Sequence, residues 1–321
     1  MRFLIFGGSG YLGSHLVDVL AAENHELVVF DNSSGKVASE FGFPVHTLLG
    51  DVTNMDDFKK IQGGFDGVFH LAAKKSVAES FTNPELYSLT NELGSNNVFN
   101  FCLGNNIKNI VFTSSAAVYG NSDSSLALAE DFPVMPINPY GVSKLNAERA
   151  LSQLSSKKLI NAISLRIFNI VGTGNRNYLD RFGENVLPIL TRKLIEGNFF
   201  TLFGNDYRTP DGTCVRDYVN VKDVAMAHVL AMKYLMNRES HSEELVLNIS
   251  SGQGISILDL IKKLENLSGI NLKLEFGEKR DGDPASVIGN NNLAKEVLGW
   301  IPQYSIDESI FQTIEGFKAL E

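Results

Sequence analysis

The sequence predicts an α/β protein built on a doubly wound parallel sheet, with a smaller α+β part toward the C-terminus. Short apolar runs alternate with longer amphipathic segments in the first half of the chain, which is the pattern of repeated strand–helix–strand units. A glycine-rich turn joins the first apolar run to the first amphipathic segment. With 321 residues, 44% of them hydrophobic and 20% charged, the chain can build one large core or two unequal ones.

The apolar runs are expected to be buried parallel strands, because they are nearly unbroken rather than alternating. The expected strands span residues 2–6, 26–31, 67–72, 109–115 and 163–168, with a weaker one at 46–51. Helices are expected after the glycine turn, near 85–104 and near 139–157. Asn138 is a good cap for the last of these helices, and Pro139 suits its first position.

The composition of the chain changes at about residue 172. Segments 172–185 and 203–218 are rich in Gly, Asn, Asp and Arg, which favours loops that face a ligand over more sheet. We therefore expect a larger domain from 1–172, with 217–250 returning to it as a further strand at 244–250, and a smaller domain from 173–216 and 251–321. Further helices are expected near 256–265, 292–298 and 306–317, the first capped by Ser256 with Asp259 three residues on.

The charge and hydropathy of the chain exclude several classes of partner. A formal net charge of -9 argues against nucleic acid, which would favour a basic stripe. No apolar stretch approaches the roughly 18 residues that a membrane span requires, and "MRFLIFGG" lacks the features of a targeting segment. We therefore expect no nucleic acid partner and no membrane anchor.

The cysteines and histidines show no pattern of a disulfide or metal site. Cys102 and Cys214 are far apart in the sequence, so a reducing, cytoplasmic location is the simplest interpretation. The six histidines show no paired ligand spacing, and neither cysteine has a Cys or His at zinc-site distance. We expect no metal.

Gly7, Gly10 and Gly13 follow the first strand directly and open a helix. Glycines at such positions permit a tight turn, close approach of a pyrophosphate and close helix packing, while the helix N-terminus offers N–H groups and partial positive charge. The spacing is GxxGxxG rather than GxGxxG, and alone it also fits a flexible turn. The strand before it and the helix after it favour a Rossmann-type dinucleotide site.

Asp31 closes the second strand, where a carboxylate can accept hydrogen bonds from an adenosine ribose and would repel a 2′-phosphate. This favours NAD over NADP. The alternative is that Asp31 only caps the end of the strand. Asp51, after the next strand, is a second candidate on the adenine side.

Tyr140 and Lys144 are one helical turn apart, so their side chains share a face. Lowering a phenol pKa from about 10 to about 7 takes roughly 4 kcal/mol, and one charge at about 4 Å with an effective dielectric of about 20 supplies about that much. We therefore expect Lys144, aided by a cationic nicotinamide, to make Tyr140 a general base. The alternative is an exposed tyrosine and a solvated lysine that share a helix face by chance.

A hydroxyl partner for Tyr140 is expected in "TSSAAVYG", which follows the strand that contains Phe112. The carboxyl ends of strands in open α/β sheets form the ligand crevice, so Ser114 or Ser115 can hydrogen-bond a substrate hydroxyl there. Hydroxyl residues are also ordinary turn formers, which is the competing interpretation.

The glycine triplet, "TSSAAVYG" and "YGVSK" together resemble the extended short-chain dehydrogenase/reductase family, whose members mostly act on nucleotide sugars. "HLAAKKSVAES", "LRIFN", "FGNDYRTPDGTCVRDYVNV" and "RDGDPAS" are similar to the UDP-galactose (UDP-glucose) 4-epimerases within it, over Met1 to about Trp300. The resemblance departs at Ile167, where the family usually has Tyr, and at Asn220, where it usually has His. These departures put the packing near the nicotinamide in doubt.

The resemblance implies roles for particular residues. Tyr140 is the catalytic base and acid, Lys144 tunes it, and Ser115 orients the sugar. The implied NAD contacts are Gly7, Gly10, Tyr11, Leu12, Gly13, Asp31, Asn32, Asp51, Val52, Leu71, Ala72, Ala73, Lys75, Tyr140, Lys144 and Phe168. The implied substrate contacts are Lys75, Asn91, Ser115, Tyr140, Asn169, Asn185, Arg216, Tyr218, Arg280, Asp283 and Val287, with the two arginines on the diphosphate. Planar guanidinium groups suit phosphate oxygens.

The resemblance also implies an activity, interconversion of UDP-glucose and UDP-galactose by transient oxidation of C4 with tightly bound NAD. Tyr140 would take the proton of the 4-hydroxyl, and rotation of the 4-keto sugar would let hydride return to its other face. Val287 occupies a position of variable bulk that is thought to gate N-acetylated sugars, so UDP-GlcNAc and UDP-GalNAc stay open as substrates. The helices near 85–104 and 139–157 resemble those that pair in the family's homodimer.

Two other functions fit parts of the pattern. A nucleotide-sugar 4,6-dehydratase or decarboxylase begins with the same oxidation, but it needs an acidic residue beside the active-site hydroxyl, where Ala116 and Ala117 follow Ser115. A non-catalytic NAD-sensing regulator would lack a working base, whereas Tyr140 and Lys144 are both present.

Overall fold

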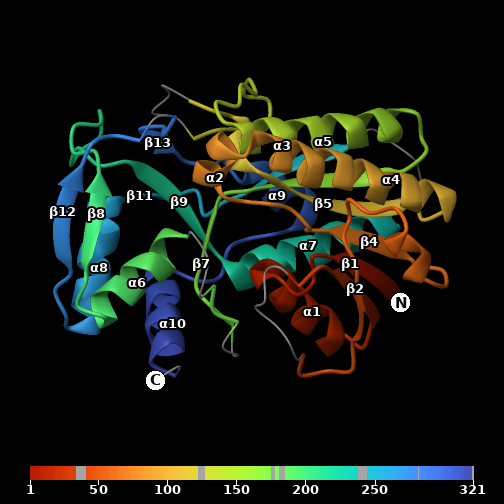
Figure 1. Cartoon of the computed structure of the whole chain (residues 1–321), viewed down its shortest axis with the longest axis horizontal. Coiled ribbons are helices and arrows are strands. Elements are labelled where there is room, and N and C mark those ends of the chain that lie inside the picture. Colours follow the sequence, from red (N-terminus) through yellow and green to blue (C-terminus); the bar gives the residue numbers. More distant parts are fainter. Residues whose placement is uncertain are drawn as a thin grey trace.

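A parallel sheet with strand order β10-β6-β5-β4-β1-β2-β3 forms the centre of the molecule (Figure 1). The computed structural model describes residues 1–33, 41–121, 127–174, 178–180, 185–237, 244–280 and 282–319. The strands of this sheet are β1 (Arg2–Phe6), β2 (Glu26–Asp31), β3 (His46–Leu49), β4 (Gly67–His70), β5 (Asn109–Ser115), β6 (Asn161–Ile167) and β10 (Leu245–Ile249). Each neighbouring pair is parallel, so the expected Rossmann-type α/β class is confirmed.

The order of the strands reverses between β1 and β4. The chain runs outward from β1 to β2 and β3, and then returns to β4 on the other side of β1. Ligands of open α/β sheets bind outside the carboxyl ends of the strands at such a switch point. Gly7, which follows β1, and Leu71, which follows β4, both lie at this point.

Helices cover both faces of the central sheet. α1 (Tyr11–Ala22), α7 (Val221–Asn237) and α9 (Asn292–Leu298) pack on one face, with Leu16, Val29 and Val224 in their shared core. α4 (Gly94–Gly104) and α5 (Pro139–Ser156) pack on the other face. Because helices cover the sheet on both sides, its strands carry apolar side chains on both faces.

A second group of elements extends from the middle of the molecule to the side opposite α1 (Figure 1). Strand β9 (Val215–Asn220) pairs with β7 (Asn169–Val171), β11 (Gly254–Ser256) and β13 (Ser286–Val287). Strands β8 (Phe199–Phe203) and β12 (Lys273–Gly277) form a two-stranded parallel sheet. Helices α6 (Val186–Ile195), α8 (Ile257–Ser268) and α10 (Ile306–Lys318) enclose a separate apolar core. The exact domain boundaries stay a prediction.

Several local predictions are confirmed. β10 joins the central sheet beside β6. The Asn138 side chain accepts a hydrogen bond from the N–H of Gly141, and α5 begins at Pro139. The Ser256 hydroxyl accepts one from the N–H of Asp259 at the start of α8.

Other local predictions are wrong in part. The strand expected over 67–72 ends at His70, and the helix expected over 85–104 consists of α3 (Pro84–Tyr87), a π-helical turn (Ser88–Leu93) and α4. Segment 203–218, expected to be loop, contains most of β9, because polar side chains such as Asp217 find partners in the segment between β10 and β11. In segment 172–185, residues 175–177 and 181–184 lie outside the described residues, and the others form no helix or strand.

The remaining short elements are α2 (Val77–Thr82) and two 3-10 turns, Asp57–Lys60 and Ala116–Val118. Within the described ranges, no helix has both the length and the apolar character needed to cross a membrane.

Candidate active site

The glycine turn after β1 packs so closely against neighbouring backbone that no larger residue would fit at Gly7 or Gly13. Gly7 has a φ of 83°, which favours glycine, and a Cβ there would lie 2.6 Å from the backbone nitrogen of Ala72. A Cβ on Gly13 would lie 2.2 Å from the carbonyl oxygen of Gly7. α1 begins at Tyr11, and its N-cap, Gly10, brings no side-chain cap to the first N–H groups. This cradle fits a dinucleotide pyrophosphate.

Asp31 lies at the carboxyl end of β2, beside the glycine turn. Its buried carboxylate accepts hydrogen bonds from the N–H groups of Ser9, at 2.9 Å, and Ser33, at 2.7 Å. Burial raises the pKa of Asp31, and these two bonds oppose the rise. The Asn32 amide donates to Asp51 over 2.9 Å. Asp31 therefore holds the glycine turn in place, and its contact with an adenosine ribose stays a prediction.

The chain leaves β4 at the switch point of the sheet. The N–H groups of Leu71 and Ala72 both donate to the carbonyl oxygen of Phe6, at 2.9 and 3.0 Å. Ala73 follows and is partly exposed. These three residues thus lie beside the glycine turn, where the sequence places cofactor contacts.

Lys75 and Asn185 meet at a carboxylate that the sequence reasoning missed. The Lys75 ammonium lies 2.7 Å from Oδ2 of Asp180, and the Asn185 amide nitrogen lies 2.6 Å from the same oxygen. The Tyr11 hydroxyl donates to the carbonyl oxygen of Gly172. These contacts join the glycine turn's side of the crevice to the segment after β7. No spacing or motif around Asp180 would have singled it out.

The structure brings Tyr140 and Ser115 together. Tyr140 lies in the first turn of α5, and Ser115 ends β5, with its hydroxyl accepting a hydrogen bond from the N–H of Ala117. Burial raises the pKa of Tyr140, and the nearby Ser115 hydroxyl opposes the rise. The expected lowering of this pKa by Lys144 is therefore wrong for the protein by itself. A phenol in these surroundings needs a further positive charge nearby to act as a base.

Lys144 is buried one turn after Tyr140, with 3% of its surface exposed. Its ammonium donates to the carbonyl oxygen of Thr113 over 2.8 Å and lies 5.0 Å from the centre of the Phe112 ring. Burial lowers the pKa of Lys144 to about 7, and the carboxylate of Glu148 opposes this fall. The exposed, solvated lysine of the competing interpretation is excluded.

We expect Lys144→Met to stabilise the protein without bound dinucleotide at about pH 7 by roughly 1–3 kcal/mol. The unfolded chain keeps the Lys144 proton up to its ordinary pKa of 10.5, whereas the folded chain loses it near about 7. Between these values the unfolded state binds more protons, so the stability of the unmodified protein rises with pH. Urea unfolding should show a higher free energy of unfolding for the variant at about pH 7, and a smaller increase at about pH 10. A variant less stable at neutral pH would contradict this.

Asn91 lies in the π-helical turn and is 1% exposed. Its amide nitrogen donates to the carbonyl oxygen of Lys74, at 3.0 Å, and to the Ser143 hydroxyl, at 2.9 Å, while its oxygen accepts from the N–H of Lys74. Asn91 therefore fixes the residue before Lys75 against α5, a frequent use of π-helical turns near functional sites. A direct contact of Asn91 with substrate stays a prediction.

A second set of polar side chains lies on β9 and in the segment before β13. Arg216 and Asp283 form an ion pair, and the guanidinium carbon of Arg280 lies 3.9 Å from the centre of the Phe203 ring. The buried Tyr218 hydroxyl has no hydrogen-bond partner among the described residues. A buried hydroxyl without a partner is costly, so Tyr218 is available to a polar ligand. The arginines suit a diphosphate.

The other expected site residues are held by packing or backbone contacts. Phe168 and Val287 belong to one buried apolar cluster, and Val287 pairs with Arg216 across two strands. The Asn169 amide donates to the carbonyl oxygen of Asp217. Leu12 and Val52 are buried.

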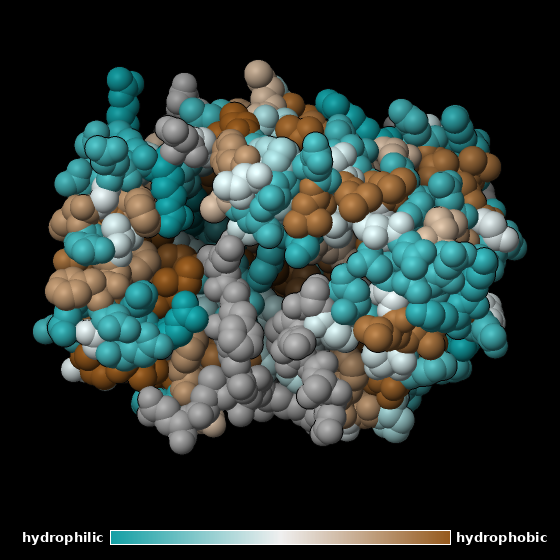
Figure 2. Space-filling model, viewed as in Figure 1, coloured by the Kyte–Doolittle hydropathy of each residue, from teal (hydrophilic) through white to brown (hydrophobic). Residues whose placement is uncertain are grey.

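Figure 2 shows a hollow at the middle of one face of the molecule, between the side that carries β8 and β12 and the side that carries α1. Among the described residues, no cluster of three or more His, Cys, Asp or Glu side chains could hold a metal ion. Cys102 and Cys214 are both buried and form no disulfide.

A glycine turn suited to a pyrophosphate and a buried acid at the next strand end, with a neighbouring tyrosine and serine beyond them, define an enzyme of the dinucleotide-dependent α/β class. The chain belongs to the NAD dependent epimerase/dehydratase family, which it matches over residues 3–249.

Relatives match the chain over nearly its whole length. It is 32% identical to a UDP-glucose 4-epimerase of Corynebacterium glutamicum, covering 99% of this chain and 96% of the relative, and 33% identical to one of Lactobacillus helveticus, with coverage of 98% and 96%. Among solved structures, the UDP-glucose-4-epimerase of Stenotrophomonas maltophila, with bound NAD and formylated UDP-arabinopyranose, gives a TM-score of 0.92 at 31% identity, covering 100% and 98%. The Bifidobacterium longum enzyme, in complex with NAD+ and UDP, gives 0.91 at 29% identity, covering 99% and 98%.

Proposed function

We propose that this protein is an NAD-dependent UDP-hexose 4-epimerase that interconverts UDP-glucose and UDP-galactose. The observation that carries the proposal is the placement of Tyr140, in the first turn of α5, beside Ser115 at the end of β5, in a chain whose relatives are UDP-glucose 4-epimerases. NAD is the cofactor, and it supplies a hydride acceptor and donor for C4 of the sugar, so that the centre inverts without net redox change.

The residues of the chain bind and orient the sugar and move its proton. Tyr140 takes the proton of the 4-hydroxyl and later returns it, while Ser115 holds the same oxygen by a hydrogen bond. Arg216 and Arg280 bind the diphosphate, and Asp283 gives up its ion pair with Arg216 when they do so. The cofactor and substrate contacts that the resemblance implies are carried into this proposal, with Lys75 exchanging Asp180 for a ligand.

The 4,6-dehydratase or decarboxylase alternative is not favoured. Ala116 and Ala117 follow Ser115, so this stretch supplies no acidic group to finish those reactions, and the relatives named above are epimerases. A non-catalytic regulator is not favoured either, because the hydroxyl pair of Tyr140 and Ser115 is assembled.

The test is to incubate the purified protein separately with UDP-glucose, UDP-galactose, UDP-GlcNAc and UDP-GalNAc, without added cofactor, and to follow the configuration at C4 by NMR. We expect UDP-glucose and UDP-galactose to approach one equilibrium mixture from both sides. The two N-acetyl arms report whether the site around Val287 accepts the larger sugars. Formation of a 4-keto-6-deoxy sugar would instead support the dehydratase alternative.

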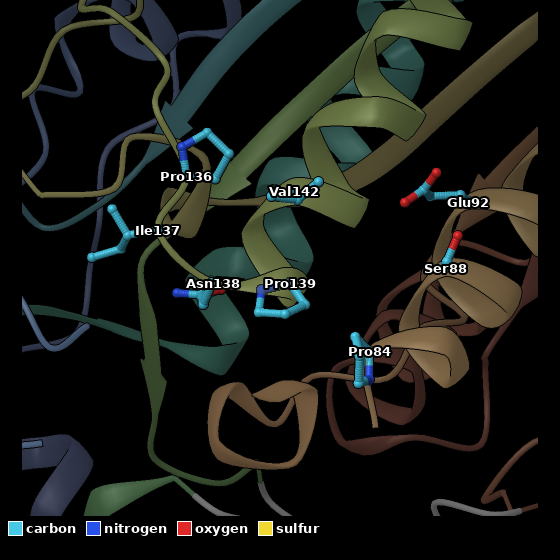
Figure 3. A pocket seen from close by; sticks show the side chains of 8 residues that line it. All are labelled: Pro84, Ser88, Glu92, Pro136, Ile137, Asn138, Pro139 and Val142. Carbon is cyan, nitrogen blue, oxygen red and sulfur yellow. The ribbon is translucent and has the colours of Figure 1, made fainter. Parts of the chain in front are cut away.

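A homodimer is part of the proposal, formed through the face that carries the π-helical turn and α5. Leu89 and Leu93 are each 46% exposed and Val142 is 41% exposed on this face. Figure 3 shows the groove beside them, with Pro84 and Ser88 on one wall and Pro139 and Val142 on the other. Apolar side chains gathered on one face favour association.

We expect Leu93→Glu to convert the dimer to monomer, because the buried apolar contact would be replaced by two like charges related by symmetry. Light scattering coupled to size-exclusion chromatography measures the mass. Leu267→Glu is the matched control, since Leu267 is 43% exposed on α8, away from this face. A monomeric unmodified protein, or an unchanged mass for Leu93→Glu, would reject the proposed interface.

We also propose the domain division expected from the sequence and a cytoplasmic location. The separate apolar core beneath α6, α8 and α10 supports the first. The two buried cysteines, which form no disulfide, support the second.

A further inference from the structure

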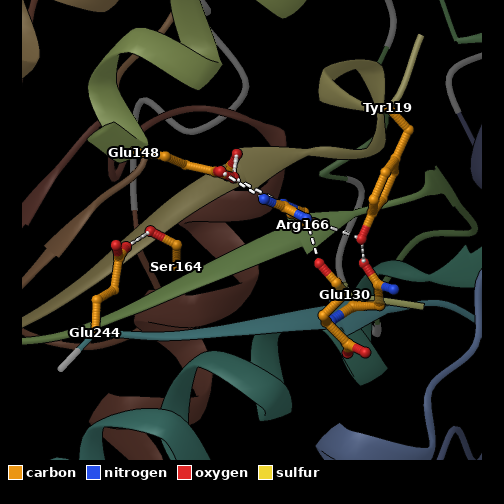
Figure 4. Close-up of polar contacts among 8 residues, drawn as sticks. Tyr119, Glu130, Glu148, Ser164, Arg166 and Glu244 are labelled. Atoms are coloured by element: carbon orange, nitrogen blue, oxygen red, sulfur yellow. Dashed lines mark hydrogen bonds and ion pairs between the residues drawn. The ribbon is translucent and has the colours of Figure 1, made fainter. Parts of the chain in front are cut away.

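A buried ion pair joins Glu148, on the helix that carries Tyr140 and Lys144, to Arg166 on β6 (Figure 4). Arg166, on β6, donates from Nε to Oε1 of Glu148 at 3.1 Å and from Nη2 to Oε2 at 2.9 Å. The side chains are 7% and 5% exposed, respectively. The contact is thus bidentate and shielded from water, the arrangement in which charge pairs act most strongly on their surroundings.

Arg166 is fixed on its far side by further partners. Its Nη1 donates to the Tyr119 hydroxyl at 3.0 Å and to the carbonyl oxygen of Glu130 at 3.3 Å. The Tyr119 hydroxyl in turn donates to the Asn248 side chain over 2.7 Å. Because every nitrogen of this guanidinium has an acceptor, the position of Glu148 is set by the fold rather than by its own side-chain freedom.

The Glu148 carboxylate touches both elements that carry the proposed catalytic residues. It lies on α5 one turn after Lys144, on the same helix face. It also accepts a hydrogen bond from the Ser114 hydroxyl, which immediately precedes Ser115 at the end of β5. One carboxylate therefore links the lysine's helix to the serine's strand.

Apart from Glu148, the groups of the described residues that face Lys144 provide no negative charge. Its own helix brings the Tyr140 phenol as well as Glu148, and β5 brings the carbonyl oxygen of Thr113. On β4, burial lowers the pKa of His70 to about 3. On α7, His228 bonds the Thr113 hydroxyl at 2.8 Å, and burial lowers its pKa to about 4. Both imidazoles are therefore neutral near pH 7.

A second buried acid lies farther back. Glu244, next to β10, accepts from the Ser164 hydroxyl on β6 (Figure 4). Burial raises the pKa of Glu244 to about 8, so it is mostly protonated at neutral pH and adds little charge. Among the described residues that face Lys144, Glu148 is the carboxylate that is paired with an arginine.

We propose that Glu148 is a positioning residue for the reaction proposed above: held by Arg166, its carboxylate keeps the Lys144 ammonium protonated beside Tyr140 and aligns the strand end that carries Ser115. The inference rests on the proposed function for its link to catalysis, but the effect on the lysine is a property of the chain alone. The sequence interpretation assigned Glu148 no role.

The decisive variant removes both charges, Glu148→Gln with Arg166→Met. Removing one partner of a buried pair leaves an uncompensated charge and is strongly destabilising, whereas replacing both partners is often neutral. The double variant is therefore expected to fold. Because the nearest carboxylate is gone, the pKa of Lys144 should fall by about one unit. Arg166→Met alone, where it folds, should raise that pKa instead, because Glu148 then acts without its counterion.

Two measurements on the purified holoprotein test this. In protein labelled with 13C at lysine Cε, the resonance that Lys144→Met lacks gives the titration midpoint of Lys144, which should move down by about one unit in the double variant. The alkaline limb of kcat for UDP-galactose should move down with it, while KM changes less than about twofold, because Glu148 does not touch substrate. Glu148→Asp in the otherwise unmodified protein keeps the negative charge, so its Lys144 titration midpoint should stay close to that of the unmodified protein.

A folded double variant with an unchanged Lys144 midpoint would overturn the inference even if the unmodified protein is an active epimerase. An unmodified protein that is inactive on every UDP-sugar would instead reject the proposed function. The NMR titration would still decide whether Glu148 controls the charge of Lys144.

Discussion

Tyr140→Phe is expected to lower kcat for the interconversion of UDP-glucose and UDP-galactose about 10²- to 10⁴-fold. The substitution removes only the hydroxyl that takes and returns the proton of the sugar. The aromatic ring stays, so its packing 6.2 Å from the ring of Tyr87 is kept. Ser115 lies beside that hydroxyl, and its own hydroxyl accepts from the N–H of Ala117, so among the described residues it has no group that would make it a base. The loss should therefore appear in kcat rather than in binding.

NMR of samples quenched at successive times measures the rate of product formation and so gives kcat. The absorbance of the protein after gel filtration gives the amount of NAD that it retains. Unchanged NAD content in Tyr140→Phe would show that the cofactor site is intact. Near-full epimerase activity in this variant would reject the assignment of Tyr140 as base and acid, whatever the activity of the unmodified protein.

Gly13→Ala is expected to abolish retention of NAD through purification and to raise its Kd more than about tenfold, which corresponds to about 1.4 kcal/mol. A Cβ at this position would lie 2.2 Å from the carbonyl oxygen of Gly7 and 2.7 Å from the Cα of Gly8. Both are backbone atoms, so they can move only if the turn itself opens. Opening the turn would displace the N–H groups of α1 that face the pyrophosphate.

Gly104→Ala is the matched control. Gly104 ends α4 and is exposed, and a Cβ there would meet nothing within 4 Å. Isothermal titration with NAD and thermal unfolding measure both variants. Tight NAD binding by Gly13→Ala would show that the cofactor does not rest on this turn, and a loss of binding by Gly104→Ala would show that the effect is not local.

The central sheet could be predicted from the sequence because its strands are buried on both faces and are therefore nearly unbroken apolar runs. The same reasoning missed β9, whose sequence VRDYVN contains charged and polar residues. Asp217 within it accepts bonds from the N–H groups of Ser251, Gly252 and Gly289. Those partners are far away in the sequence, so no local pattern reveals that a buried aspartate there is satisfied.

The candidate site could be predicted only as far as chemistry follows from neighbours in the sequence. The helical spacing of Tyr140 and Lys144 gave their shared face, but not the burial that raises the pKa of one and lowers that of the other. Desolvation depends on what packs around a group. Asp180 and Glu148 were missed for the same reason, since their partners Lys75 and Arg166 come from other elements.

The direct junction of β9 with α7 has a mechanical consequence. Asn220 ends the strand and Val221 begins the helix, with no loop between them, and α7 is anchored in the core of the central sheet. Arg216 therefore lies on a continuous strand–helix element, and the helical end of that element is fixed against the central sheet that carries the cofactor site. A diphosphate bound to Arg216 would therefore keep its position while the hexose attached to it rotates. The junction of β9 and α7 would thus provide the fixed point for that rotation.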